Sequence, residues 1–353
     1  MYDIVIVGAG PGGANLARLI SGKYKILLID KGYMENETPK NLSHKCCGGL
    51  LAPDAQKMIA KLGLSLPKDI LVNPQIFAVR TIDMTNNIER LYQRFYINFD
   101  REKFDKWFVS LVPDQVDKRF NCLFKEFKKI PEGYELKYIH KGQEETVKTR
   151  IIIGADGAHS KVRSLINKNE NKPKEYIAIQ EWFECNDHMP YYGAIFDEEI
   201  TDFYSWTIPK DNYIILGSAL KPKDNSLEKF EKLKIKLKDY GFRFDNKIKR
   251  EGAYIFRPTK ISNLYVGDDN IALIGEAAGA ISPSSAQGIS YALRTSLHLA
   301  SCLEDSTEGF IDRYEKKVND IKIKLLLKKI KSPAMYQPLV RQMAMKSGIQ
   351  SIR

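Results

Sequence analysis

The chain has 353 residues, a formal net charge of +11, 43% hydrophobic and 28% charged residues. These are values of globular proteins, and no apolar run approaches the ~20 residues needed to cross a bilayer. At about 150 residues per domain, the length predicts roughly two domains. The five cysteines form no Cys-x-x-Cys pair and have no His at ligand spacing, so we expect neither a disulfide scaffold nor a metal site.

The first elements form one βαβ unit. Residues 3–7 are almost wholly apolar, as expected for a parallel strand covered on both faces. Residues 12–21 are predicted to be helical, and residues 24–30 form a second buried strand. The chain begins directly with this unit instead of a secretory signal, so we expect a cytoplasmic protein.

The turn between the first strand and the helix reads Gly8-Ala-Gly10-Pro11-Gly12-Gly13. In such a Gly-x-Gly-x-x-Gly loop the first glycine makes a tight turn, the second lets the backbone approach a pyrophosphate, and the third allows close helix–strand packing. Asp30 and the adjoining Lys31 end the second strand. The Asp30 carboxylate is placed to accept hydrogen bonds from the ribose hydroxyls of the cofactor, which favours a cofactor with a 2′-hydroxyl over one with a 2′-phosphate. The loop alone does not separate NAD from FAD.

Further along the chain, residues 150–154 and 270–275 are apolar runs that look like later strands of the same sheet. Residues 203–208 and 213–217 alternate as strands do, and residues 209–212 read as the turn between them. They predict an antiparallel sheet inserted into the first domain. Residues 288–303 and 310–331 are predicted helices, broken up afterwards by Pro333 and Pro338.

Two of these later segments carry motifs of their own. Residues 154–163, with Asp156, and residues 275–288, with Glu276, resemble in order and spacing the second and third cofactor motifs of the flavin-dependent hydroxylase and reductase superfamily. The resemblance implies FAD as the cofactor. It implies that Glu276, where Asp is usual, contacts the ribityl–pyrophosphate region.

The same resemblance assigns further cofactor residues. Gly275 precedes the acid, and the loop that leads to Gly288 and Ile289 would cover the flavin ring. Arg101 opens a predicted amphipathic helix and matches an arginine that lies near the flavin in this superfamily.

The resemblance implies an α/β fold: a Rossmann-type FAD-binding domain interleaved with an antiparallel-sheet substrate domain, and a short helical C-terminus. We expect the FAD domain to comprise residues 1–72, 99–165 and 262–305, the substrate domain residues 73–98 and 166–261, and the basic helical segment residues 306–353.

Two segments indicate the substrate. Tyr204-Ser-Trp206-Thr-Ile-Pro resembles the Tyr-x-Trp-x-Phe-Pro signature of geranylgeranyl reductases, and Lys45-Cys46-Cys47-Gly-Gly resembles their Lys-Cys-Gly-Gly segment. The resemblance places the cysteine loop near the isoalloxazine, which makes Cys46 and Cys47 the candidate catalytic residues. Tyr204 and Trp206 are the candidate substrate contacts, because alternating aromatic side chains present apolar faces to an isoprenoid or aromatic ring. Both pairs are also compatible with ordinary core residues.

The reaction these segments favour is reduction of a carbon–carbon double bond by hydride transfer from reduced flavin, on an isoprenoid or another apolar substrate. The proton donor is open among His44, Lys45, Cys47 and a water molecule. Alternatives are an aromatic monooxygenase, a flavin halogenase, whose Trp-x-Trp-x-Ile-Pro segment is also similar, and a flavin-binding protein without catalysis. The sequence shows no second dinucleotide motif, so the electron donor is not identified.

Charge is concentrated at the C-terminus. Residues 313–353 hold eleven Lys or Arg against two acids, a net of +9. Val318, Ile321, Leu325 and Leu326 share roughly one helical face, so this helix either lies on an anionic membrane surface or packs on the domain. Nucleic acid is not an expected partner, because no aromatic residues are interleaved to stack bases. The oligomeric state is not predicted.

Overall fold

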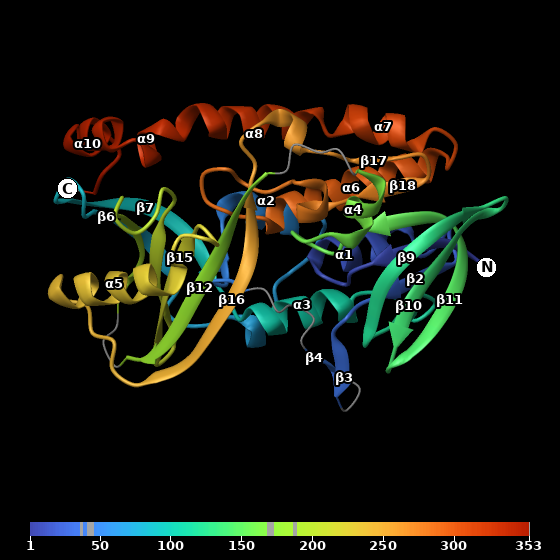
Figure 1. The fold of residues 1–353 in the computed structure, drawn as a ribbon, viewed down its shortest axis with the longest axis horizontal. Coiled ribbons are helices and arrows are strands. Elements are labelled where there is room, and N and C mark those ends of the chain that lie inside the picture. The colour runs from blue at the N-terminus through green and yellow to red at the C-terminus, as the bar shows by residue number, and fades with distance from the viewer. Residues whose placement is uncertain (36–37, 41–45, 168–172, 186–188, 353) are drawn as a thin grey trace.

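The protein folds around two large β-sheets, and the computed structural model describes residues 1–35, 38–40, 46–167, 173–185 and 189–352. Figure 1 shows the two sheets side by side along the long axis, with the C-terminal helices running along one edge of both. The fold is therefore α/β, with a Rossmann-type sheet and a separate, mostly antiparallel sheet, as the sequence predicts.

The first sheet has a parallel centre. Strand β1 pairs in parallel with β2 and β11, and β11 pairs in parallel with β18. Both faces of these strands are covered, which is why they read as apolar runs. The eight strands are β1 (Tyr2–Val7), β2 (Ile26–Ile29), β8 (Asp117–Arg119), β9 (Cys122–Ile130), β10 (Gly133–His140), β11 (Gln143–Gly154), β17 (Gly267–Asp268) and β18 (Ile271–Leu273).

The second sheet carries the aromatic motif in its middle. Its neighbours are antiparallel except for the parallel pair β6–β13, so this sheet is mixed. In spatial order its strands are β16 (Lys247–Arg257), β12 (Lys174–Glu184), β15 (Tyr213–Leu220), β14 (Ser205–Lys210), β13 (Tyr191–Phe196), β6 (Ile76–Asp83), β7 (Ile88–Asn98) and β5 (Leu50–Leu51). A small hairpin joins β3 (Tyr33–Glu35) and β4 (Thr38–Lys40).

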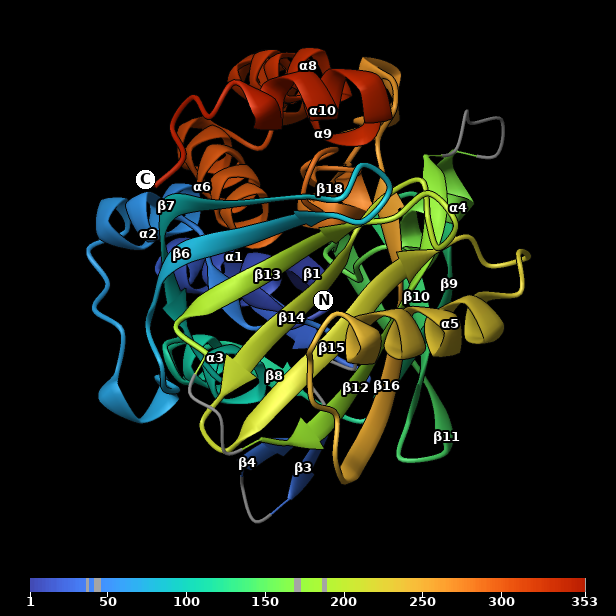
Figure 2. The same ribbon diagram turned by 90° about the vertical axis from the view of Figure 1, so that its left-hand side faces the viewer.

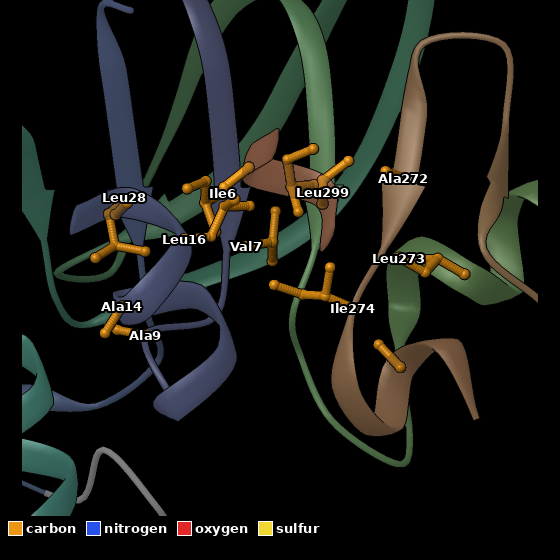
Figure 3. Packing of buried hydrophobic residues seen from close by; sticks show 14 of the residues in the cluster. Ile6, Val7, Ala9, Ala14, Leu16, Leu28, Ala272, Leu273, Ile274 and Leu299 are labelled. Carbon is orange, nitrogen blue, oxygen red and sulfur yellow. The ribbon is translucent and has the colours of Figure 1, made fainter. Parts of the chain in front are cut away.

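The main core joins the first sheet to two helices, α1 (Pro11–Ile20) and α6 (Ile289–Asp305). Figure 3 shows Ile6 of β1, Leu16 of α1 and Leu299 of α6 packed together, and all three side chains are fully buried. The two helices are also tied by a buried hydrogen bond of 2.7 Å from Asn15 Nδ2 to Ser296 Oγ. The packing fixes the start of both helices against the carboxyl ends of the central strands.

The remaining helices lie around these sheets. They are α2 (Pro53–Lys61), α3 (Arg101–Ser110), α4 (Lys161–Ile166), α5 (Ser226–Asp239), α7 (Phe310–Lys317), α8 (Asn319–Lys331), α9 (Pro333–Tyr336) and α10 (Pro338–Lys346), with three short 3₁₀ turns at Lys68–Ile70, Ile261–Asn263 and Gly275–Ala278. Among the helices that the structure describes, none is both long and apolar enough to cross a membrane.

Helices α7 to α10 form an arm that is fastened to both sheets. At one end, buried Tyr314 donates a hydrogen bond of 3.0 Å to the Leu273 carbonyl in β18. At the other end, buried Arg341 forms an ion pair with buried Asp83 at the end of β6, with 2.7 Å between Nε and Oδ2. Removal of one partner of such a pair leaves an uncompensated buried charge, so this contact holds the arm in place.

Three details differ from the sequence-based expectations. Pro209 and Lys210 belong to β14, so the turn expected over residues 209–212 is reduced to Asp211 and Asn212. The helix expected over residues 310–331 is two helices that meet at Val318, whose ψ of 2° is not helical. Strand β5 belongs to the second sheet although residues 1–72 were assigned to the FAD domain; the domain boundaries themselves stay a prediction.

Candidate active site

The glycine loop at the start of α1 is built by close contacts of backbone with backbone. A Cβ on Gly13 would lie 1.9 Å from the Gly8 carbonyl oxygen, so only glycine allows the helix to start this close to β1. Gly8 has a φ of +109°, and a Cβ there would lie 2.4 Å from the Ala155 oxygen. By contrast, a Cβ on Gly10 would meet nothing within 4 Å. Gly10 therefore borders open space at the positive end of the helix dipole, as a pyrophosphate site requires.

Asp30 lies beside this loop at the end of β2. Its Oδ2 accepts the N–H of Ala9 and its Oδ1 the N–H of Gly32, both at 2.7 Å. Burial raises the pKa of Asp30, while the two N–H donors act in the opposite direction. Each carboxylate oxygen keeps acceptor capacity for a ribose hydroxyl. Lys31, which follows it, is exposed.

Asp156 lies against the same loop, and its side chain caps the first turn of α4. Its carboxylate accepts from Ser160 Oγ at 2.5 Å and from the Lys161 N–H at 2.7 Å, which satisfies the first turn of α4. The adjacent Ala155 is the residue that approaches Gly8. The structure therefore brings the first and second motifs together, and direct contact of Asp156 with the cofactor stays a prediction.

One cavity of about 190 Å³ lies between the two sheets, next to the N-termini of α1 and α6. It is many times larger than the space of one water molecule. Predicted residues from five separate segments meet in its wall: Pro11, Cys46, Cys47, Arg101, Tyr204, Trp206, Glu276, Gly288 and Ile289. The predicted cofactor residues that do not line it are Gly8, Gly10, Gly12, Gly13, Asp30, Lys31, Asp156 and Gly275.

The two cysteines have different surroundings. Cys46 packs with the apolar cluster around Trp206, and burial raises the pKa of its thiol well above the usual value. Cys47 Sγ accepts the N–H of Gly49 at 3.4 Å and is hydrogen-bonded to the Arg101 guanidinium. Of the two cysteines, Cys47 is therefore the one whose sulfur is held by hydrogen-bond donors in the cavity wall.

Arg101 is the first residue of α3 and is held by its own helix. Its Nε lies 2.9 Å from Oδ1 of Asp105, one turn later, and Asp105 is fully buried. Burial disfavours the charge of Arg101, but Asp105 and Cys47 outweigh it and raise the pKa of the guanidinium. Arg101 is thus a fixed cation in the cavity wall.

Lys210 is a site residue that the sequence reasoning missed, because Pro209 and Lys210 read as a turn. The side chain is buried, and Nζ donates to the carbonyls of Gly49 at 2.9 Å and Phe99 at 2.7 Å. It therefore ties the cysteine loop to the segment that leads into α3. Burial lowers the pKa of Lys210 to about 7.

Aromatic side chains form the wall of the cavity on the second sheet. Tyr204 donates to the Ser285 carbonyl at 2.9 Å and is also hydrogen-bonded to Tyr192, and the rings of Tyr204 and Trp206 are 5.5 Å apart. Tyr96 of β7 and Tyr192 of β13 line the cavity too, and sequence reasoning missed both. Their strand-like surroundings were visible in the sequence, but nothing there showed that β13 pairs with β14.

Residues of the third motif form a further part of the cavity wall. Glu276 is buried and its Oε1 accepts the N–H of Phe256 at 3.2 Å. Gly275 has a φ of +60° and donates its N–H to Thr295 Oγ1. His44 and Lys45 lie outside the described residues. Within the described part of the chain, no group of three or more His, Cys, Asp or Glu side chains could hold a metal.

The buried Lys210 makes stability depend on pH. Its folded pKa of about 7 lies below the unfolded value of about 10.4, so between these values the unfolded chain binds a proton that the folded protein lacks. The free energy of unfolding should therefore rise with pH in this window, by up to about 1.4 kcal/mol per pH unit. Urea unfolding of Lys210→Met should lack this contribution, whereas Lys238→Met, at an exposed site on α5, should keep it. If the free energy of unfolding depends on pH equally in the wild type and in Lys210→Met, the lowered pKa of Lys210 is contradicted.

Several solved structures share this fold. A geranylgeranyl bacteriochlorophyll reductase-like protein from Thermoplasma acidophilum has a TM-score of 0.80 at 17% identity, covering 97% of this chain and 90% of its own. A probable FAD-dependent monooxygenase from Pseudomonas aeruginosa has a TM-score of 0.70 at 14% identity, covering 99% of both chains. A triple mutant of a flavin-dependent brominase has a TM-score of 0.71 at 18% identity, with 98% and 94% coverage. The shared feature is the fold of FAD-dependent enzymes.

Closer similarity is found in sequence. No protein-family model matches the chain. The protein CbrA of Escherichia coli K12 is 38% identical over 351 residues, which cover 99% of this chain and 98% of that protein. CbrA of Shigella sonnei has the same identity and coverage. With this identity over almost its whole length, the chain belongs to the CbrA family.

Proposed function

We propose that this chain is an FAD-dependent oxidoreductase that reduces a carbon–carbon double bond of an isoprenoid or another apolar substrate. The observation that carries the proposal is the cavity itself, which joins the start of the glycine-loop helix to an aromatic wall on the second sheet. A ligand with a pyrophosphate and a large planar ring would span both parts. The shared fold of FAD-dependent enzymes supports the same cofactor.

The residues fit FAD in three places. The open space at Gly10 suits the pyrophosphate, and the two oxygens of Asp30 suit the ribose hydroxyls. Pro11, Gly288 and the cysteine loop border the space for the ring. When bound in reduced form, FAD supplies the hydride, and the protein supplies binding, orientation and exclusion of water.

The chain's own residues would then place the substrate and handle the proton. Tyr204 and Trp206 offer apolar ring faces, and burial raises the pKa of Tyr204 to above its usual range, so its hydroxyl stays neutral. Cys47 is the candidate proton donor among the described residues, because it lines the cavity and its sulfur is hydrogen-bonded to the Gly49 N–H and to Arg101. The second candidate function is hydroxylation of an aromatic compound, since the same aromatic wall accepts a planar ring.

Substitution of Gly10 tests the cofactor site. Gly10→Ala should fold as the wild type does, with the free energy of unfolding changed by less than about 0.5 kcal/mol, because a Cβ there meets no protein atom. Affinity for FAD should fall roughly tenfold to a hundredfold, since the methyl group enters the space of the pyrophosphate. Gly22→Ala, which also places its Cβ in open space, is the matched control and should bind FAD normally. Unchanged FAD affinity in Gly10→Ala would refute the assignment of this loop as the pyrophosphate site.

Anaerobic reoxidation tests the reaction. The flavoprotein is reduced without oxygen and mixed with a prenyl alkene; return of oxidised-flavin absorbance together with a saturated product is the expected result. Gly217→Ala should slow this step by about tenfold or more with unchanged FAD content, because its Cβ would lie 2.2 Å from the Trp206 ring and push it into the cavity. Gly252→Ala, on β16 of the same sheet, makes only an ordinary contact at 3.5 Å and should react normally. Product formed solely from oxygen and an aromatic substrate would identify a monooxygenase, and halide dependence a halogenase.

A further inference from the structure

The outward side of α8 carries an exposed apolar stripe. Ile323, Leu327 and Ile330 are 59%, 52% and 65% exposed, and their spacing of four and three residues places them on one face of the helix. The expected lipid-facing set was different: Val318, Ile321 and Leu325 of that set are buried against the main core. The helix therefore has two apolar faces, and the body of the protein covers one of them.

Helix α10 repeats this arrangement. Arg341 and Met345 are buried on its inner side, whereas Leu339 and Met343 are 73% and 63% exposed on the opposite side. Figures 1 and 2 both place α8 and α10 along the same edge of the molecule. We call the exposed faces of these two helices the C-terminal ridge. Of the nineteen exposed large apolar side chains in the described chain, eight lie between residues 323 and 352.

Positive charge accompanies the ridge. Residues 313–353 hold a net charge of +9, so residues 1–312 together contribute only +2 of the total of +11. Lys324, Lys329 and Lys331 are exposed on α8, and Lys346 is exposed at the end of α10. Exposed apolar residues interleaved with lysines match the interface of an anionic bilayer. The apolar side chains can reach the acyl chains there, and the lysines can contact the anionic headgroups. Two ridges facing each other would instead bring like charges together, which disfavours a second copy as the occupant.

The ridge is a fixed surface and not a loose tail. The Tyr314 and Arg341 contacts fasten the arm to both sheets. Between the two helices, Tyr336 of α9 donates to the Ser284 carbonyl at 2.5 Å, and its ring lies 4.2 Å from the Arg257 guanidinium. The adjacent Ser285 lines the cavity. The short helix between α8 and α10 is therefore fastened to the segment that lines the cavity.

We propose that the C-terminal ridge docks on the surface of an anionic phospholipid bilayer, with Ile323, Leu327 and Ile330 at the boundary between headgroups and acyl chains. Along its 13 residues α8 offers a contact about 20 Å long. The lysines around it contact the anionic headgroups. This docking depends on the surface alone and holds whatever reaction the cavity supports.

Vesicle co-sedimentation of the full-length, FAD-loaded protein tests the proposal. The wild type should bind vesicles of phosphatidylcholine and phosphatidylglycerol in equal parts, and bind phosphatidylcholine alone at least about tenfold more weakly. Leu327→Glu/Ile330→Glu should weaken binding to the mixed vesicles by about tenfold or more. The matched control is Leu227→Glu/Ile235→Glu, which changes two exposed apolar residues of α5 and should bind as the wild type does. Circular dichroism establishes that both variants are folded.

Two further measurements test the contribution of the lysines and the alternative that the ridge binds a second copy of the chain. Lys324→Glu/Lys329→Glu should lower binding to the mixed vesicles at least about tenfold, and high salt should do the same for the wild type. Absence of vesicle binding by the wild type, or equal loss in the α5 control, overturns the proposal. So does sedimentation velocity that shows a dimer abolished by Leu327→Glu/Ile330→Glu without any vesicle binding, because the ridge would then be an interface between copies.

Discussion

The site depends on one close approach of backbone to backbone, at Gly8 and Gly13. Because neither residue has a side chain, α1 starts directly over the end of β1, and the loop after β11 reaches the same point through Ala155. Helix α6 joins from the other side, where a Cβ on Gly12 would only just touch Ala292 at 3.5 Å. Two helix N-termini and the ends of two strands thus converge near the space that Gly10 leaves open, and the next residue, Pro11, lines the cavity.

Two buried cations, Arg101 and Lys210, hold the part of the chain around the cysteine loop. Arg101 is compensated by Asp105, and Lys210, whose pKa burial lowers to about 7, loses its charge easily while it keeps two N–H groups for the carbonyls of Gly49 and Phe99. The cysteine loop is consequently held by hydrogen bonds from both cations, Lys210 to the Gly49 carbonyl and Arg101 to Cys47. Cys47 lies beside two donors, the Gly49 N–H of this loop and the Arg101 guanidinium.

Much of the first sheet could be predicted from sequence, because local signals there agree with one another. The apolar runs of β1 and β2, the glycine loop and Asp30 lie within thirty residues and specify one unit. The second sheet is harder to predict from sequence, because no local signal reveals that β13 pairs with both β14 and β6. Tyr96 and Tyr192 were therefore missed as residues of the cavity wall. Lys210 was read as a turn residue because Pro209 suggested one, although proline's missing N–H is tolerated here. The break at Val318 was invisible, because Tyr314, Val318, Ile321 and Leu325 continue the helical spacing of buried residues.

The central claim is that one ligand spans the glycine loop and the inter-sheet cavity. A crystal structure of the protein with FAD tests it most directly. We predict the pyrophosphate at Gly10 and the N-terminus of α1, the ribose at Asp30, and the flavin ring inside the cavity between the Cys47 loop and the segment that leads to Gly288. A flavin ring outside this cavity, or a pyrophosphate bound away from Gly10, would contradict the account.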